Sequence, residues 1–180
     1  MSQLVIGPFF FAMRSCEYCK TQGTRRTKLL TLRNLRFFSG KRELSHYDPY
    51  LSLADSVSIT FEYQKRDQRN DTITQHHMGD FILCPIRQWA AITQYPGTTS
   101  SSTVNTIINE NGKLALIDSK MLLDKLRAAA TAIGIDELGF IAEDIGLHSL
   151  RSGAAMAMYL SSIPVFTIML IGRWSSDAFL

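Results

Sequence analysis

The 180-residue chain has little cysteine, and the two apolar runs that stand out in it are short. Three cysteines, an odd number without regular spacing, fit a reducing compartment better than a disulfide framework. The runs LVIGPFFFAM and IPVFTIMLIG each have ten residues, whereas a membrane span needs about 20. The start of the chain lacks the features of a secretory signal. We therefore expect no membrane partner and an intracellular location, nuclear if the source is eukaryotic.

Acidic residues are also scarce in the first quarter of the chain. Residues 1–42 carry nine Lys or Arg and a single acid, Glu17, so this segment is net +8. Because the whole chain is +3, the remainder is −5. Clustered cations can neutralise phosphates and release counterions, which favours a polyanionic partner. The alternative is a basic face that only meets solvent.

The length and the 46% apolar composition predict one domain with one core. Apolar spacing predicts a helix after Pro8 that carries Phe11, Ala12, Cys16 and Cys19. Further helices are predicted over 84–95, 119–134 and 148–162, the last with Ser149 as N-cap, and from Pro164 in a first turn to a stop at Gly172.

Three segments rich in Thr, Ile, Val and Phe predict strands over 27–38, 56–65 and 72–78. The last two would form a β-hairpin with a polar tip. The sequence therefore predicts a mainly α fold with a small antiparallel β-sheet, an α+β class.

The motif C-x-x-C at Cys16 and Cys19 could supply half of a zinc site or a redox-active dithiol. A structural zinc site normally needs four ligands, and no second pair follows at a recognised spacing, although Cys84, His76 and His77 are available. A dithiol would need a βαβ context that this stretch lacks. We therefore favour buried helix cysteines.

The motif H-x-x-R, formed by His148 and Arg151, stands at the start of a predicted helix. An imidazole and a guanidinium at this spacing can converge on one phosphate, the first moving a proton and the second forming a bidentate pair. A helix N-terminus adds N–H donors. The alternative is a structural histidine beside a surface arginine.

Four blocks in order, AMRSCEY, FEYQKRDQRND, GLHSLRSGAA and LIGRWSS, resemble the tyrosine recombinase (phage-type integrase) family. They correspond to an arginine with an acid three residues later, a lysine on a β-hairpin, H-x-x-R, and a final G-His/Trp-S-S box. The last two blocks are most similar to Crypton-like recombinases of eukaryotic mobile elements. The resemblance implies the family's catalytic-domain fold, and DNA recombination and integration by phosphotyrosine transesterification in complete relatives.

The resemblance also implies roles for individual residues. Arg14 and Arg151 would clamp the scissile phosphate. His148 would accept a proton or hold the phosphate. Lys65 would protonate the departing 5′ oxygen, with its neighbours Arg66 and Arg69 as alternatives. Trp174 stands where most members have His, and would pack and donate its indole N–H.

Glu17 would support Arg14 from one helical turn away. The resemblance implies no metal, nucleotide or redox cofactor. The implied partners are double-stranded DNA and other recombinase protomers.

The nucleophilic tyrosine of the family would fall just beyond Leu180, and Tyr159 does not match its position. We therefore expect residues 1–180 to be a single, C-terminally truncated catalytic domain without the family's N-terminal core-binding domain, and to lack cleavage activity. Three other readings remain open: a non-catalytic DNA-binding or regulatory protein that keeps the arginines, a type IB topoisomerase, and the cysteine-based protein considered above.

Overall fold

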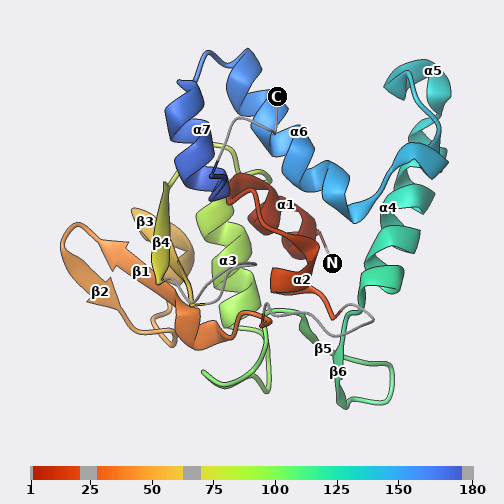
Figure 1. Ribbon diagram of the computed structural model, residues 1–180. Helices are drawn as coiled ribbons and strands as arrows, with labels where there is room; N and C mark the ends of the chain where they lie inside the picture. Colours follow the sequence, from red (N-terminus) through yellow and green to blue (C-terminus); the bar gives the residue numbers. More distant parts are fainter. Residues whose placement is uncertain (1, 21–27, 63–69, 176–180) are drawn as a thin grey trace.

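A computed structural model describes residues 2–20, 28–62 and 70–175. Its α-helices are α1 (Gln3–Phe10), α2 (Ser15–Tyr18), α3 (Pro85–Thr93), α4 (Ser119–Ile133), α5 (Ile135–Leu138), α6 (Leu147–Leu160) and α7 (Val165–Gly172). Its strands are β1 (Leu35–Ser39), β2 (Arg42–Leu44), β3 (Ser56–Phe61), β4 (Asp71–His76), β5 (Thr106–Ile108) and β6 (Leu114–Leu116). Short 3-10 turns are η1 (Leu32–Asn34), η2 (Leu51–Leu53) and η3 (Ala142–Asp144). Helices and a small antiparallel sheet are thus combined in one chain, as expected (Figure 1).

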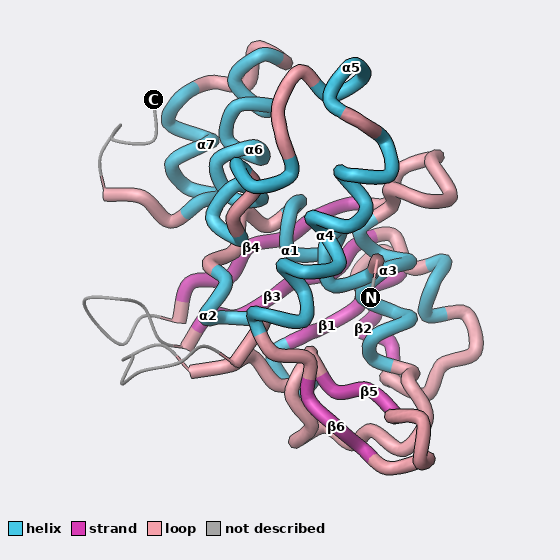
Figure 2. Tube along the Cα trace, turned by 90° about the vertical axis from the view of Figure 1, so that its right-hand side faces the viewer, coloured by secondary structure: helices cyan, strands magenta, loops and turns pink. Residues whose placement is uncertain are grey.

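The main sheet has four antiparallel strands in the order β2-β1-β3-β4. Side chains alternate between its two faces, so Phe37, Val57 and Ile59 enter the core while Thr72 and Thr74 face solvent. The predicted β3–β4 hairpin is confirmed, with Ser56 opposite His76 and Phe61 opposite Asp71. Figure 2 shows these strands side by side behind α1, with the separate β5–β6 hairpin below them.

Helix α3 joins the sheet to the first helix. Pro85 occupies its first turn, as predicted, and fully buried Trp89 meets Phe11 edge-on with ring centroids 6.1 Å apart. Helix α3 packs against α1, β3 and β4. The aromatic pair therefore anchors the N-terminal segment on the sheet.

The first and last helices of the chain lie together. Helix α1 packs against α6, and α6 packs against α7, so α1 lies between α3 and the C-terminal helices (Figure 1). This arrangement brings residues near position 14 beside residues near positions 151 and 173.

Helix α4 confirms the prediction for 119–134. Asp118 caps it by accepting the N–H of Met121 at 2.8 Å, and Gly134 ends it at φ 94°, a conformation that suits glycine. Arg127 donates to the carbonyls of Ile145 (3.0 Å) and Glu143 (2.9 Å), which ties the segment before α6 to α4.

The predicted continuous helix after Pro8 is wrong. Pro8 lies inside α1, which ends at Phe10, and Ala12 adopts φ 43° before α2 starts at Ser15. Cys16 and Cys19 are buried, as predicted, and free, but only Cys16 lies in a helix, because α2 ends at Tyr18. The apolar spacing that suggested one helix reflects burial of a bent segment on several sides.

Other boundaries also differ from the predictions. Strand β1 starts only at Leu35, because Leu32–Asn34 forms a 3-10 turn, and β2, β5 and β6 were not predicted. Gly146, rather than Ser149, precedes α6 as N-cap, and the Ser149 hydroxyl accepts the Gly146 N–H at 3.0 Å from the third helical position. Pro164 lies just before α7 rather than inside its first turn.

Membrane spans were expected to be absent. No helix within the described ranges is long and apolar enough to cross a bilayer.

Two helical glycines give opposite predictions for replacement by alanine. A Cβ at Gly7 in α1 would lie 2.9 Å from Cε2 of buried Trp89, whereas a Cβ at Gly153 in α6 would make an ordinary 3.7 Å contact with Phe9. Both changes gain about 1 kcal/mol of helix propensity, but overpacking costs roughly 1–3 kcal/mol. Denaturant unfolding should show Gly7→Ala destabilised and Gly153→Ala stabilised; stabilisation by both would contradict the tight Gly7–Trp89 contact.

Candidate functional site

Arg14 and Glu17 open the short helix α2 as a pair. Arg14 precedes the helix with an extended backbone (φ −77°, ψ 142°). The Glu17 carboxylate accepts the Arg14 backbone N–H on Oε2 at 2.7 Å and the Arg14 Nη1–H on Oε1 at 3.2 Å. This is the carboxylate half of a capping box, which satisfies an N–H group at the helix start. Glu17 thus holds both the backbone and the side chain of Arg14.

Arg173 reaches the same carboxylate from the end of α7. Its Nη2 donates to Glu17 Oε2 at 2.8 Å, and only 1% of its side chain and 2% of the Glu17 side chain are exposed. Its Nη1 donates to the carbonyls of Phe11 and Ile171, each at 3.3 Å. The guanidinium lies over the Phe61 ring, 3.5 Å from its centroid. The ion pair is therefore enclosed by α1, α7 and β3.

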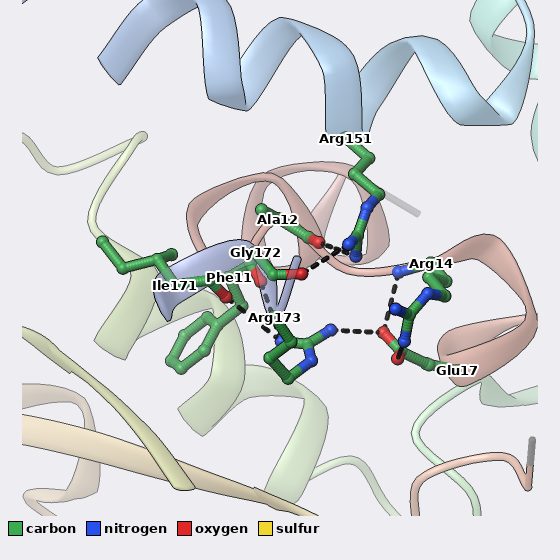
Figure 3. Close-up of polar contacts among 8 residues, drawn as sticks. All are labelled: Phe11, Ala12, Arg14, Glu17, Arg151, Ile171, Gly172 and Arg173. Atoms are coloured by element: carbon green, nitrogen blue, oxygen red, sulfur yellow. Dashed lines mark hydrogen bonds and ion pairs between the residues drawn. The ribbon is translucent and has the colours of Figure 1, made fainter. Parts of the chain in front are cut away.

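Arg151 projects from α6 toward the same place (Figure 3). It is buried, and its Nη1 donates to the Ala12 carbonyl at 2.6 Å while its Nη2 donates to the Gly172 carbonyl. The Trp174 ring lies against the guanidinium, with its centroid 4.1 Å from Cζ. Two carbonyls and one aromatic face therefore fix the orientation of Arg151.

The break between α1 and α2 supplies two of these acceptors. The last carbonyls of a helix have no partner within it and carry partial negative charge. After α1 the chain turns at Ala12 (φ 43°), and the carbonyls of Phe11 and Ala12 accept from Arg173 and Arg151. The departure from a continuous helix is thus what lets two C-terminal arginines dock on the N-terminal segment.

Gly172 is a close-packing position beside Arg151. It is the last residue of α7, and Arg173 after it adopts the left-handed conformation (φ 55°, ψ 44°). A Cβ on Gly172 would overlap the Trp174 ring. The helix therefore ends at Gly172, as predicted. Glycine is needed at this position because the Trp174 ring approaches closely, and the left-handed conformation belongs to Arg173 instead.

The cluster carries more positive charge than its own acid balances. Arg14, Arg151 and Arg173 lie around the carboxylate of Glu17, and Asp71 is a second acid that acts on Arg173, so three cations and two acids leave a formal charge of +1. Burial, then the charges of Arg14 and Arg173, lower the pKa of Arg151 to about 9, and burial first of all lowers the pKa of Arg173. Both directions show that these cations lack full compensation. An anion placed beside them would remove part of that penalty.

Two of the predicted site residues are not joined to the cluster by the described contacts. His148 is exposed in the first turn of α6, one turn before Arg151, and no hydrogen bond of its side chain occurs among the described residues. Lys65 lies outside the described residues. The structure therefore brings together Arg14, Glu17, Arg151 and Trp174.

The described part of the chain holds no metal-binding cluster around the cysteines. Within residues 2–20, 28–62 and 70–175 no three His, Cys, Asp or Glu side chains are grouped to hold a metal ion. Burial, with a smaller contribution from Asp118, raises the pKa of Cys19 to about 12, which disfavours the reactive thiolate.

Arg173 is the site residue that the sequence analysis missed. It stands inside the quoted box LIGRWSS, between the predicted helix stop and Trp174. One signal was available: a single cation directly follows eight uncharged, mostly apolar residues, VFTIMLIG, where burial is expected. Its partner Glu17, however, is 156 residues away in the chain.

Comparisons with models of protein families and with curated proteins found no match.

Inorganic phosphate should stabilise the folded protein through the cluster. Binding to the folded state raises the melting temperature by mass action, and Arg14 keeps 22% of its side chain exposed to meet a ligand. At constant ionic strength, phosphate should raise the melting temperature of the wild type and do so much less in Arg14→Ala. The control Lys113→Ala, an exposed cation beside β6, should respond as the wild type does. Equal shifts in all three proteins would contradict an anion site at Arg14.

Gly172→Ala should displace Trp174 from Arg151. The added Cβ forces the ring outward, and the helix gain of about 1 kcal/mol does not offset roughly 1–3 kcal/mol of overpacking. Because Trp89 is buried, iodide quenching of tryptophan fluorescence reports mainly on Trp174 and should increase. Gly79→Ala, which meets nothing within 4 Å, is the control; unchanged quenching in Gly172→Ala would contradict the predicted packing.

Proposed function

We propose that this chain is a DNA-binding catalytic-domain segment of a tyrosine recombinase, with the fold of that family. The main support is that Arg14 of the first block and Arg151 of the third lie in one cluster. They are far apart in the sequence, and Arg151 donates to the carbonyl of Ala12, which is 139 residues away in the chain. The last block adds Trp174 against Arg151. Arginines that only met solvent would not be expected to lie together in one cluster with residues of three separate blocks.

The chemistry of the cluster suits a phosphodiester. Charge builds on the non-bridging oxygens during phosphoryl transfer, and fixed cations stabilise it when they need not reorganise. Arg14 is held by Glu17 and keeps 22% of its side chain exposed, so it is oriented before a ligand arrives. Arg151 is 3% exposed and held by two carbonyls and Trp174, so it contributes fixed positive charge beside Arg14. The excess charge of the cluster favours an anionic ligand over a neutral one.

In the proposed reaction of complete relatives, a tyrosine oxygen attacks phosphorus and the bond from phosphorus to the 5′ oxygen breaks. The residues corresponding to His148 and Lys65 would act on protons: the first would accept the proton of the attacking hydroxyl or hold the phosphate, and the second would give a proton to the departing 5′ oxygen. We assign no nucleophile within residues 1–180, so the activity proposed for the chain as given is binding. The proposed partners are double-stranded DNA and other protomers, at an intracellular location.

A second candidate is a non-catalytic DNA-binding protein. The observation that favours it is the exposed His148 without a described contact to the arginines. DNA binding without cleavage would need the arginines of the cluster but not His148.

Duplex DNA affinity measured against salt tests the proposal. Fluorescence anisotropy should show the logarithm of the affinity falling linearly with the logarithm of the salt concentration. A charged hydrogen bond contributes about 1.5–3 kcal/mol, so Arg14→Ala should weaken binding by roughly tenfold or more, and Lys113→Ala should change it little. Salt-independent binding, or the same loss in both variants, would refute the phosphate role of Arg14.

A further inference from the structure

Arg173 is buried too deeply to bind a ligand itself. Its side chain is 1% exposed against 22% for Arg14, and its Nη groups already donate to Glu17 and to two carbonyls. It is nevertheless the group that neutralises the buried carboxylate most directly, at 2.8 Å. Any effect of Arg173 on a ligand must therefore pass through another residue.

Glu17 is the residue through which that effect would pass. Its Oε2 accepts from Arg173 and from the Arg14 backbone, at 2.8 and 2.7 Å, while its Oε1 accepts from the Arg14 side chain. A carboxylate with 2% exposure is unfavourable without a close cation, and loss of one partner of a buried pair leaves an uncompensated charge. Without Arg173, Glu17 would shift toward water or toward Arg14 and would no longer hold Arg14 in its present orientation.

The position of Arg173 fits this task. Its backbone is left-handed at φ 55° where α7 ends. The planar guanidinium donates to Glu17 and to the Phe11 carbonyl in two directions, while its face covers Phe61. A lysine, with one ammonium group, cannot present two fixed donors and a flat face together. The geometry is specific to arginine.

We infer that Arg173 is a positioning residue that orients Arg14 for phosphate through the shared carboxylate of Glu17. This inference rests on the proposed function, since it gives the oriented Arg14 a phosphate to meet.

A double-mutant cycle on duplex DNA affinity tests the inference. Arg14→Ala and Arg173→Gln should each weaken binding by roughly tenfold, and Arg173→Gln should add almost nothing in the Arg14→Ala background. Arg33→Gln is the control for additivity. The Arg33 side chain is exposed and makes a long ion pair of 3.8 Å with Glu62, so this change should have the same small effect in both backgrounds. An Arg173→Gln loss that is equal in both backgrounds, or absent, would overturn the inference.

A DNA-independent readout separates this inference from the proposed function. In the free protein, NMR relaxation of the Arg14 Nε–H group, assigned with Arg14→Lys, should show an ordered side chain that becomes mobile in Arg173→Gln. If Arg14 becomes mobile but Arg14→Ala leaves DNA affinity unchanged, positioning stands and the proposed function fails. If Arg14 stays ordered in Arg173→Gln, positioning fails whatever the DNA result.

Arg173→Gln could fail to fold, which circular dichroism would reveal. In that case the test uses Glu17→Gln in place of Arg173→Gln. Glutamine keeps the shape of the Glu17 side chain and removes the negative charge that Arg14 and Arg173 share. It should weaken DNA binding in the wild type and have little effect in the Arg14→Ala background. Equal weakening in both backgrounds would overturn the inference.

Discussion

The enclosed ion pair between Glu17 and Arg173 is the constraint on which the rest of this site depends. Two charges withdrawn from water carry a large desolvation penalty, which is offset only when hydrogen bonds satisfy their remaining atoms. Glu17 meets this condition with two donors from Arg14. Arg173 meets it in part, because its Nη1 donates to two carbonyls and its face covers Phe61, while its buried Nε has no hydrogen-bond partner among the described residues. The pair thereby fixes how the first and last parts of the chain meet.

The irregular backbone between α1 and α2 makes that meeting possible. A continuous helix would have used the carbonyls of Phe11 and Ala12 internally, whereas the turn at Ala12 leaves them for Arg173 and Arg151. The negative end of α1 thus faces two cations that arrive from α6 and α7. The carbonyls orient these arginines without neutralising them, because a carbonyl carries no formal charge. A net positive, water-depleted cluster results, which is the electrostatic environment that a phosphate-binding site requires.

Local sequence patterns predicted much of the fold. Helices α3 and α4 and the pairing of Arg14 with Glu17 depend on interactions within a few residues, where periodicity, capping residues and i, i+3 spacing are informative. The β3–β4 hairpin joins two strands that are neighbours in the chain, and their composition was enough to predict it. The helix break at Ala12 and the β5–β6 hairpin escaped prediction. The first follows from tertiary packing, since the apolar residues around it are buried on different sides of a bend. The second joins strands of only three residues each, too short for a clear alternating pattern.

The sequence alone determined the order of the four blocks and the excess of positive charge in residues 1–42. It also determined the candidate site residues, which were Arg14, Glu17, Lys65, His148, Arg151 and Trp174. Only the tertiary structure decided that a third arginine, Arg173, belongs with them, and that it lies deeper than Arg14. The physical reason is that burial and charge pairing depend on which distant segments pack together. No local pattern records that residue 173 will meet residue 17, because the contact exists only once α1, α6 and α7 have assembled.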